Sequence, residues 1–249
     1  MSWLRRLLRR GPAPFAPAWR ALLERRLPQH ALLDAVLLPR FEARVQDFLR
    51  RKRFYGCDGL VVTEEMRVLV AGVAALLVLR EDAAAYPQLR SVLLYPRAFW
   101  VRHREPYDIG GDLELVSDEE QLQLGESQDV GRVVLSWEDV QAALAGDPVH
   151  VAAHEFAHQL NDENPGIEGA PPLADYGRWS RVMEAALQEL GRRGSPVLDE
   201  YGLEGPAEFF AVATEAYLQR GALLQRHHPE LYALLRDYYL LDTAQLRAH

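Results

Sequence analysis

The stretch VHVAAHEFAHQLND, residues 149–162, decides what this chain can do. Its apolar residues follow a helical period, and at its centre His154, Glu155 and His158 form the pattern H-E-x-x-H. Two histidines four residues apart project from the same helix face, one turn above each other. Both imidazoles can therefore reach one metal ion while the glutamate lies beside it. This arrangement suits zinc-assisted hydrolysis with the glutamate as general base.

A third histidine, His150, stands four residues before His154. Each step of four residues along a helix rises about 6 Å, so His150 and His158 lie about 12 Å apart along the axis. Zinc–nitrogen bonds of about 2 Å cannot span that distance. Because Glu155 lies between them in the H-E-x-x-H pattern, His154 and His158 are the pair that we expect to share the metal ion. We expect His150 to be a surface residue at the helix start or a group at the rim of the pocket.

A catalytic zinc site needs a third protein ligand and an open position for water. The longer pattern H-E-x-x-H-x-x-G-x-x-H is absent, which favours a carboxylate on another helix. Glu208 and Glu215 stand seven residues apart in the apolar segment PAEFFAVATEAYL and share a helix face. A metal ion would explain carboxylates in such surroundings, and a solvated helix face is the alternative for each. The spacing does not choose between the two.

Composition bounds the class of protein. The 249 residues are 49% hydrophobic and 26% charged, as in a soluble globular protein. Cys57 is the one cysteine, so the chain cannot form an internal disulfide, which favours a reducing compartment. The segment MSWLRRLLRR lacks the continuous apolar core of a signal peptide, and no apolar run reaches 18 residues. We expect a cytoplasmic protein without a membrane partner.

Charge is distributed unevenly along the chain. Residues 1–53 carry 13 Lys/Arg against 4 Asp/Glu, whereas the whole chain has a net charge of −8. A basic segment can bind nucleic acid, but aromatic residues for base stacking are sparse there. No helix-turn-helix or zinc-finger pattern occurs either. We therefore interpret the basic segment as solvated and expect no direct binding of nucleic acid.

The order of predicted elements indicates an α+β fold, because helices precede and follow a group of short β-prone runs. Those runs are Ser91–Tyr95, Phe99–Arg102, Leu113–Val116 and Gly131–Leu135, which we interpret as a small mixed sheet. Thr63, Ser136 and Asp147 are predicted to cap helices. Our predicted organisation is a flexible arm at 1–17 and a single domain at 18–249. Within that domain we place the sheet at about 54–136, the zinc-site helices at about 147–220 and a C-terminal helix at about 229–240.

Several further segments resemble those of one family. They are FLRRKRFYG (48–56), SVLLYP (91–96), GESQDVGRVVLSWEDV (125–140), HEFAHQLND (154–162), GAPPL (169–173), Tyr176, Trp179, DEYGLEGPAEFFAVATEAYL (199–218) and HHPELYALLRDYYLLD (227–242). Together they are similar to the Mlc titration factor A family, over about residues 40–240. The resemblance implies a zincin-like metallopeptidase fold, with a catalytic core similar to that of anthrax lethal factor. It also implies a cytosolic zinc peptidase, and in some members binding of Mlc, a glucose-responsive transcriptional repressor.

Residue by residue, the resemblance implies that His154, His158 and Glu208 hold one Zn²⁺ and that Glu155 is the general base. Tyr201, seven residues before Glu208, matches a tyrosine that faces the metal, where a phenol can donate to a developing oxyanion. Glu215 would then support a ligand or pack between helices.

There is one departure from the family pattern. Asn161 stands where the family often has aspartate, with Asp162 next, which puts in doubt a carboxylate partner for a ligand histidine.

The function expected from these features is peptide hydrolysis, aminopeptidase-like on short peptides, with the peptide laid beside Gly131–Leu135. The resemblance also implies binding of an Mlc-like repressor as a second role, and we expect a monomer. The alternative is a non-catalytic regulatory protein that binds a repressor and holds a structural zinc. Structural zinc sites normally have four Cys/His ligands, whereas this sequence offers three ligands with a base beside them, which favours the enzyme.

Overall fold

The computed structural model describes residues 14–80, 86–97, 131–164 and 166–246. Its elements, in chain order, are α2 (Pro17–Arg26), η1 (Pro28–Leu32), α3 (Leu37–Arg51), β1 (Arg53–Gly56), α4 (Glu64–Leu76), β2 (Ser91–Tyr95), β3 (Arg132–Ser136), α6 (Trp137–Leu144), α7 (Val151–Asp162), α8 (Gly177–Arg193), η2 (Glu200–Glu204), α9 (Pro206–Gln219), α10 (Gly221–His227), α11 (Pro229–Tyr239) and η3 (Thr243–Gln245). This order confirms the α+β class. Within the described ranges, no helix has the length and apolarity needed to cross a bilayer.

The three described strands form one parallel sheet in the order β1–β2–β3, in which Ser91 pairs with both Arg53 and Arg132. The predictions of β2 and β3 are confirmed to within a residue. The strands predicted at 99–102 and 113–116 lie outside the described residues, so the mixed character of the sheet stays a prediction. We did not predict β1 as a strand, because its four residues follow α3 after Lys52 alone and are too few to show an alternating pattern.

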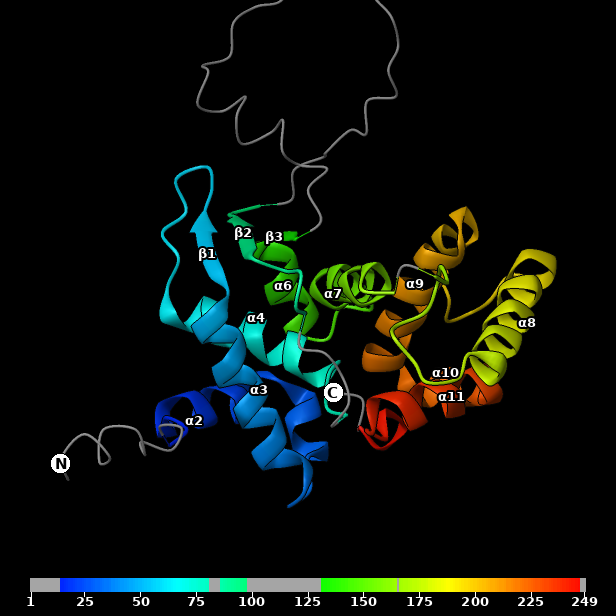
Figure 1. The fold of residues 1–249 in the computed structure, drawn as a ribbon, viewed down its shortest axis with the longest axis horizontal. Helices are drawn as coiled ribbons and strands as arrows, with labels where there is room; N and C mark the ends of the chain where they lie inside the picture. Colours follow the sequence, from blue (N-terminus) through cyan, green and yellow to red (C-terminus); the bar gives the residue numbers. More distant parts are fainter. Residues whose placement is uncertain (1–13, 81–85, 98–130, 165, 247–249) are drawn as a thin grey trace, which may run out of the picture.

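Helix α7, which carries H-E-x-x-H, lies at the centre of the molecule (Figure 1). The sheet and the N-terminal helices α2, α3 and α4 lie on one side of it, and α8 to α11 lie on the other (Figure 1). Contacts of α7 with α4, β3 and α9 join the two sides. The motif is therefore held between two halves of the fold, so that one helix face is buried and the opposite flank meets α9.

Phe156 fixes the orientation of α7, because it is fully buried and points away from the histidine face. Its ring lies 5.6 Å from that of Phe48 on α3 and 5.3 Å from that of Tyr86, both centroid to centroid. The hydroxyl of Tyr86 donates to the carbonyl of Ala74 in α4 at 2.9 Å. This aromatic cluster binds α7 to α3 and α4, and so determines which face of the motif turns toward α9.

Replacing Phe156 with alanine is expected to lower the free energy of unfolding by about 3–5 kcal/mol, because it removes a buried ring and leaves a cavity between α7, α3 and α4. Urea denaturation followed by circular dichroism measures the change. The control is Val149→Ala, a change at an exposed position, which we expect to cost less than about 0.5 kcal/mol. A loss below about 1 kcal/mol for Phe156→Ala would show that the ring does not anchor α7.

Two predicted helix caps are confirmed and one is wrong. Thr63 Oγ1 accepts from the backbone N–H of Met66 at 3.2 Å, and Ser136 Oγ accepts from that of Asp139 at 3.3 Å. Asp147 does not cap α7. Its carboxylate accepts from the backbone N–H of Val149 at 2.9 Å and closes a turn before the helix. The helix begins three residues later than predicted, because a different side chain caps it.

Two helix starts are set by the residues before them. The short helix η1 precedes α3, which begins at Leu37. Helix α8 begins at Gly177, and in the loop before it the backbone N–H of Leu173 donates to the hydroxyl of Tyr176 at 2.9 Å. Residues 1–13 of the predicted arm lie outside the described residues, and Phe15 is already buried, with its ring 5.8 Å from that of Trp19.

Candidate metal centre

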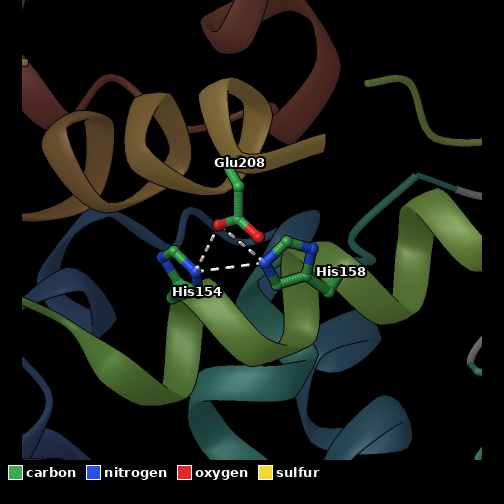
Figure 2. A group of neighbouring side chains, drawn as sticks. All are labelled: His154, His158 and Glu208. Carbon is green, nitrogen blue, oxygen red and sulfur yellow. Dashed lines mark hydrogen bonds and ion pairs between the residues drawn. The ribbon is translucent and has the colours of Figure 1, made fainter. Parts of the chain in front are cut away.

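Three side chains that could ligate a metal meet where α7 faces the first turn of α9: His154, His158 and Glu208 (Figure 2). The two imidazoles face each other at 3.1 Å between their Nε2 atoms. Glu208 Oε2 lies 3.2 Å from Nε2 of His154 and 3.2 Å from Nε2 of His158. The three donor atoms thus form a nearly equilateral triangle.

The size of this triangle fits a metal ion. Bonds of about 2.0–2.1 Å to a tetrahedrally coordinated ion place neighbouring ligand atoms about 3.3 Å apart. The donors are two imidazole nitrogens and one carboxylate oxygen, a set that divalent first-row ions accept. The side chains of His154, His158 and Glu208 are only 14%, 22% and 24% exposed. Three protein donors of a tetrahedral set leave the fourth position open, as a catalytic site requires.

The loop after α7 sets the position of Glu208. Gly169 has φ +78°, and a Cβ there would lie 2.6 Å from the carbonyl oxygen of Pro206 at the start of α9. Only glycine allows this close approach of loop and helix. The backbone N–H of Gly169 donates to Asn161 Oδ1 at 2.7 Å, and its carbonyl accepts from Trp179 Nε1 at 2.9 Å. Asn161, the departure from the family pattern, therefore holds the loop that positions α9.

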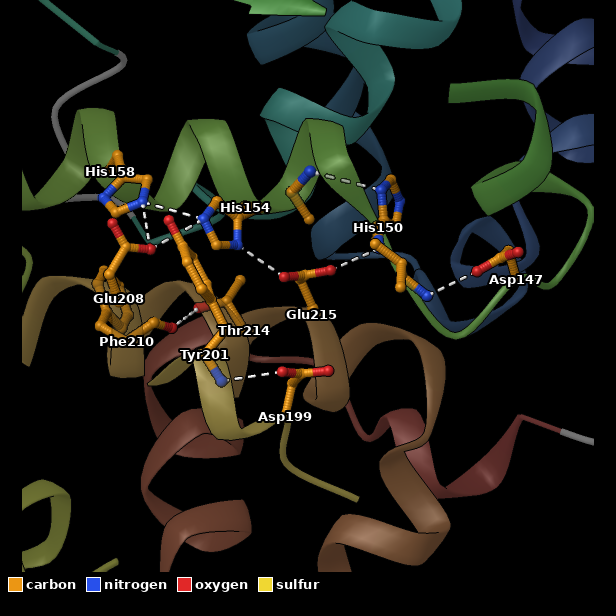
Figure 3. A network of polar contacts seen from close by, with 12 residues as sticks. Asp147, His150, His154, His158, Asp199, Tyr201, Glu208, Phe210, Thr214 and Glu215 are labelled. Atoms are coloured by element: carbon orange, nitrogen blue, oxygen red, sulfur yellow. Dashed lines mark hydrogen bonds and ion pairs between the residues drawn. The ribbon is translucent and has the colours of Figure 1, made fainter. Parts of the chain in front are cut away.

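The structure places Glu208 and Glu215 on opposite sides of His154. Glu208 meets the Nε2 atoms of both histidines, whereas Glu215 Oε1 lies 2.7 Å from His154 Nδ1. The other oxygen of Glu215 accepts from the backbone N–H of His150 at 2.6 Å (Figure 3). A carboxylate on Nδ1 favours the tautomer with the proton there and leaves the Nε2 lone pair directed at the metal position. Glu215 thus supplies the carboxylate partner that Asn161 left in doubt.

Replacing Glu215 with alanine is expected to weaken metal binding by about 10- to 100-fold, because His154 loses the partner that fixes its ring and its tautomer. Competition against a chromogenic zinc chelator measures the affinity. Glu215→Gln keeps an acceptor oxygen and should lose less. An unchanged affinity in Glu215→Ala would show that His154 is oriented by its backbone and by packing alone.

The prediction for His150 is wrong: it is neither a surface residue nor a group at the pocket rim. Its side chain is buried, at 1% exposure, and its Nδ1 accepts from the backbone N–H of Ala153 at 3.4 Å as the N-cap of α7. Burial lowers the pKa of His150 to about 4, so the ring is neutral at pH 7. A neutral imidazole can accept the capping hydrogen bond, which explains why an apolar site tolerates this histidine.

Two predicted catalytic side chains lie beside the triangle. Glu155 and Tyr201 line a common cavity with His154. Burial raises the pKa of Glu155, although His154 and His158 oppose the shift. The Tyr201 ring centroid lies 6.0 Å from that of His154, and the side chain is 45% exposed. Burial, with Glu208 nearby, raises the pKa of Tyr201, so the phenol keeps its proton at neutral pH and can donate a hydrogen bond.

The metal-free site holds a proton that a metal ion must displace. Burial lowers the pKa of His154, but hydrogen bonds to Glu208 and Glu215 outweigh it and raise the pKa to about 10. Burial raises the pKa of Glu208, but hydrogen bonds to His154 and His158 lower it to about 2. At pH 7 the metal-free site therefore contains a protonated His154 between two carboxylates. Ligation needs the neutral imidazole.

Metal binding is therefore expected to release about one proton at pH 7, and the apparent affinity should rise about tenfold per pH unit between pH 7 and 9, below the pKa of His154. Calorimetric titration with Zn²⁺ in buffers of different ionisation enthalpy counts the protons. Binding heats that do not depend on the buffer would show that His154 is neutral before the metal arrives.

Two histidines of an H-E-x-x-H helix facing a glutamate from a second helix, in an α+β fold, form a group that could hold a metal ion, as a metallopeptidase requires. The chain belongs to the glucose-regulated metallo-peptidase M90 family, whose sequence model matches residues 1–240. This match includes residues 1–39, which the resemblance found from the sequence did not cover.

Curated relatives agree with this assignment. The chain is 36% identical to an uncharacterized protein of Synechocystis sp., over 97% of this chain and 90% of the relative. It is 30% identical to the Mlc titration factor A of Pectobacterium atrosepticum, over 90% of this chain and 86% of the relative. It is also 30% identical to that of Yersinia pestis, over 87% and 82%. The resemblance noted from the sequence is confirmed.

Proposed function

We propose that this protein is a zinc-dependent peptidase in which His154, His158 and Glu208 hold one zinc ion and Glu155 is the general base. The observation that carries the proposal is the triangle of donor atoms with sides of 3.1, 3.2 and 3.2 Å. Zinc is the ion that two imidazoles and one carboxylate bind in peptidases of the H-E-x-x-H type. Membership of a metallopeptidase family supports hydrolysis of peptides as the reaction.

Each side chain has a distinct role in the proposed mechanism. A zinc ion held here would supply Lewis-acid activation of water and of the substrate carbonyl. Glu155 accepts a proton from the attacking water and passes it to the leaving amine. The raised pKa of Glu155 brings it closer to neutrality, which suits a group that both accepts and donates a proton. Tyr201 donates its hydroxyl hydrogen bond to the carbonyl oxygen as negative charge develops there.

The proposed substrate is a short peptide from which the amino-terminal residue is removed, in the cytoplasm and by a monomer. Removal of the amino-terminal residue from short peptides is proposed from the family resemblance. The peptide would lie in extended form beside β3, which is an edge strand among the described strands and packs against α7. The half-exposed Val134 at the middle of β3 would then contact the substrate.

Reconstitution with metal tests the proposal. Protein stripped with a chelator should regain hydrolysis of alanine p-nitroanilide in proportion to added Zn²⁺, up to one ion per chain. An N-acetylated alanine p-nitroanilide should be cleaved poorly if a free amino terminus is needed, and a library of longer blocked peptides tests internal cleavage. Absence of zinc-dependent cleavage in all three substrate sets would contradict the peptidase.

A regulatory role is the second candidate, because two of the relatives bear the name Mlc titration factor A. We propose that this chain also binds an Mlc-like transcriptional repressor. Analytical size-exclusion chromatography of the chain mixed with such a repressor tests this. Binding that is equal for wild type and for Glu155→Gln would separate the regulatory role from catalysis. A complex without any peptidase activity would favour the non-catalytic alternative, in which zinc is structural.

A further inference from the structure

A cavity of about 360 Å³ extends from the metal centre on the side of His154 and Glu155. It lies between the start of α7 and the end of α9, with Asp199 and Tyr201 on a third side. Valines 149, 151 and 212 supply the apolar part of its lining. This volume is in the range of small-ligand sites, and apolar walls with a few polar groups are typical of them. None of the roles proposed so far uses the end of the cavity away from Glu208.

Arg220, the residue that follows α9, supplies a cation to this cavity. Its Nε is enclosed and has no hydrogen-bond partner. The structure gives the guanidinium no hydrogen bond or ion pair with any described residue. Buried donors are nearly always satisfied, and a partly buried arginine is usually paired with an anion. Arg220 therefore brings a positive charge to the cavity that no described residue neutralises, and an anionic ligand bound by the rest of the guanidinium would supply the counter-ion.

None of the three acidic residues that line the cavity, Glu155, Asp199 and Glu215, forms an ion pair with Arg220. Both oxygens of Glu215 are used, by His154 Nδ1 and by the backbone N–H of His150 (Figure 3). Asp199 Oδ1 accepts from the backbone N–H of Tyr201 at 2.9 Å. Gln219, next to Arg220, donates to the carbonyl of Ala143 at 2.8 Å and so ties the end of α9 to the residues before α7. Among the described residues, Arg220 is thus left without a paired anion.

We propose that Arg220 binds a carboxylate of the substrate in this cavity, and so sets a preference for peptides that carry one near the cleaved bond. The inference rests on the proposed peptidase function and adds a specificity residue to it. A guanidinium binds a carboxylate through two parallel hydrogen bonds, which suits Arg better than Lys for this role. The valines of the lining would contact the aliphatic part of the same substrate residue.

Distance along α9 limits where that carboxylate lies on the substrate. Arg220 follows Glu208 by twelve residues, or about 18 Å of helix rise, and a long side chain on a helix leans back toward its N-terminus by several ångströms. An extended peptide advances about 3.3 Å per residue. The carboxylate is therefore about two to four residues along the peptide from the bond at the metal. It comes either from an acidic side chain or from the free carboxyl end of a short peptide.

Calorimetry with four tripeptides tests the inference. The receptor is zinc-loaded Glu155→Gln protein, which is expected to bind without cleaving. Ala-Ala-Ala is compared with its C-terminal amide, and Ala-Ala-Glu-amide with Ala-Ala-Gln-amide. At least one carboxylate peptide should bind about tenfold more tightly than its neutral partner, as a charge-assisted hydrogen bond predicts. The pair that differs identifies the source of the carboxylate. Equal affinities within both pairs would overturn the proposal without any change to Arg220.

Substitutions then assign the preference to Arg220. In the same background, Arg220→Gln should remove the difference, and Arg220→Lys should keep part of it because the charge remains. Arg226→Gln is the matched control, since Arg226 is exposed on α10 and does not line the cavity. A preference that survives in Arg220→Gln, or that is lost in Arg226→Gln as well, would overturn the assignment.

The two proposals can fail separately. A carboxylate preference that depends on Arg220, in a protein that hydrolyses nothing, would support the binding site and contradict the peptidase. Zinc-dependent hydrolysis without any carboxylate preference would support the peptidase and contradict the role of Arg220.

Discussion

Replacing Glu155 with glutamine is expected to lower kcat for hydrolysis of alanine p-nitroanilide by about a thousandfold, while zinc stays bound. Glutamine has nearly the same shape as glutamate but cannot accept the proton that the attacking water must lose. A positioned general base contributes about 10²–10⁴ in rate. Glu155 does not belong to the triangle of donor atoms, so its loss should leave the three ligands in place.

Steady-state kinetics and metal analysis on the same protein sample measure both halves of this prediction. Glu230→Gln, the same change at an exposed position of α11, is the control and should keep full activity. Thermal unfolding of the variant shows whether the fold is intact. Turnover at a tenth of the wild-type rate or more, in a protein that holds one zinc ion, would contradict the assignment of Glu155 as the base.

Replacing Glu208 with alanine is expected to remove zinc and with it all hydrolysis. Glu208 is the ligand contributed by α9, and its Oε2 lies 3.2 Å from the Nε2 atoms of both histidines. Two histidines alone hold zinc far more weakly than a set of three ligands. The loss of affinity should therefore exceed the 10- to 100-fold expected for Glu215→Ala, which removes only a supporting hydrogen bond.

Competition with a zinc chelator, run in parallel for Glu208→Ala and Glu215→Ala, ranks the two carboxylates. Glu204→Ala is the matched control, because Glu204 is exposed at the end of η2 and does not belong to the donor triangle. A Glu208→Ala protein that retains full zinc affinity would show that Glu215 or another carboxylate is the third ligand.

The sequence could predict the two histidines of the site, but not how α9 meets them. The spacing of His154 and His158 places both rings on one helix face, whatever the rest of the fold does. Glu208 and Glu215 also share a face, so their choice depends on how α9 is rotated and displaced against α7. That arrangement depends on the contact of Gly169 with Pro206 at the start of α9. Gly169 lies far from both glutamates along the chain, so no local sequence pattern indicates this contact. Only the resemblance to a family indicated Glu208.

The wrong prediction of the α7 cap also has its cause in a contact between distant parts of the chain. Asp147 and His150 could both cap a helix, and residue preference favours aspartate. The structure uses His150, because Glu215 from α9 binds its backbone N–H and helps fix the first turn of α7 there. The cavity at Arg220 was not predicted either, because it joins the end of one helix to the start of another. No spacing along the chain indicates such a pairing.

The central claim is that His154, His158 and Glu208 hold a catalytic zinc ion with one position open. A crystal of the zinc-loaded protein, with anomalous scattering measured at the zinc edge, tests it most directly. The predicted result is one peak about 2.0–2.2 Å from His154 Nε2, His158 Nε2 and a carboxylate oxygen of Glu208, with no fourth protein ligand. A peak at another place, or a fourth protein side chain that closes the coordination, would contradict the account.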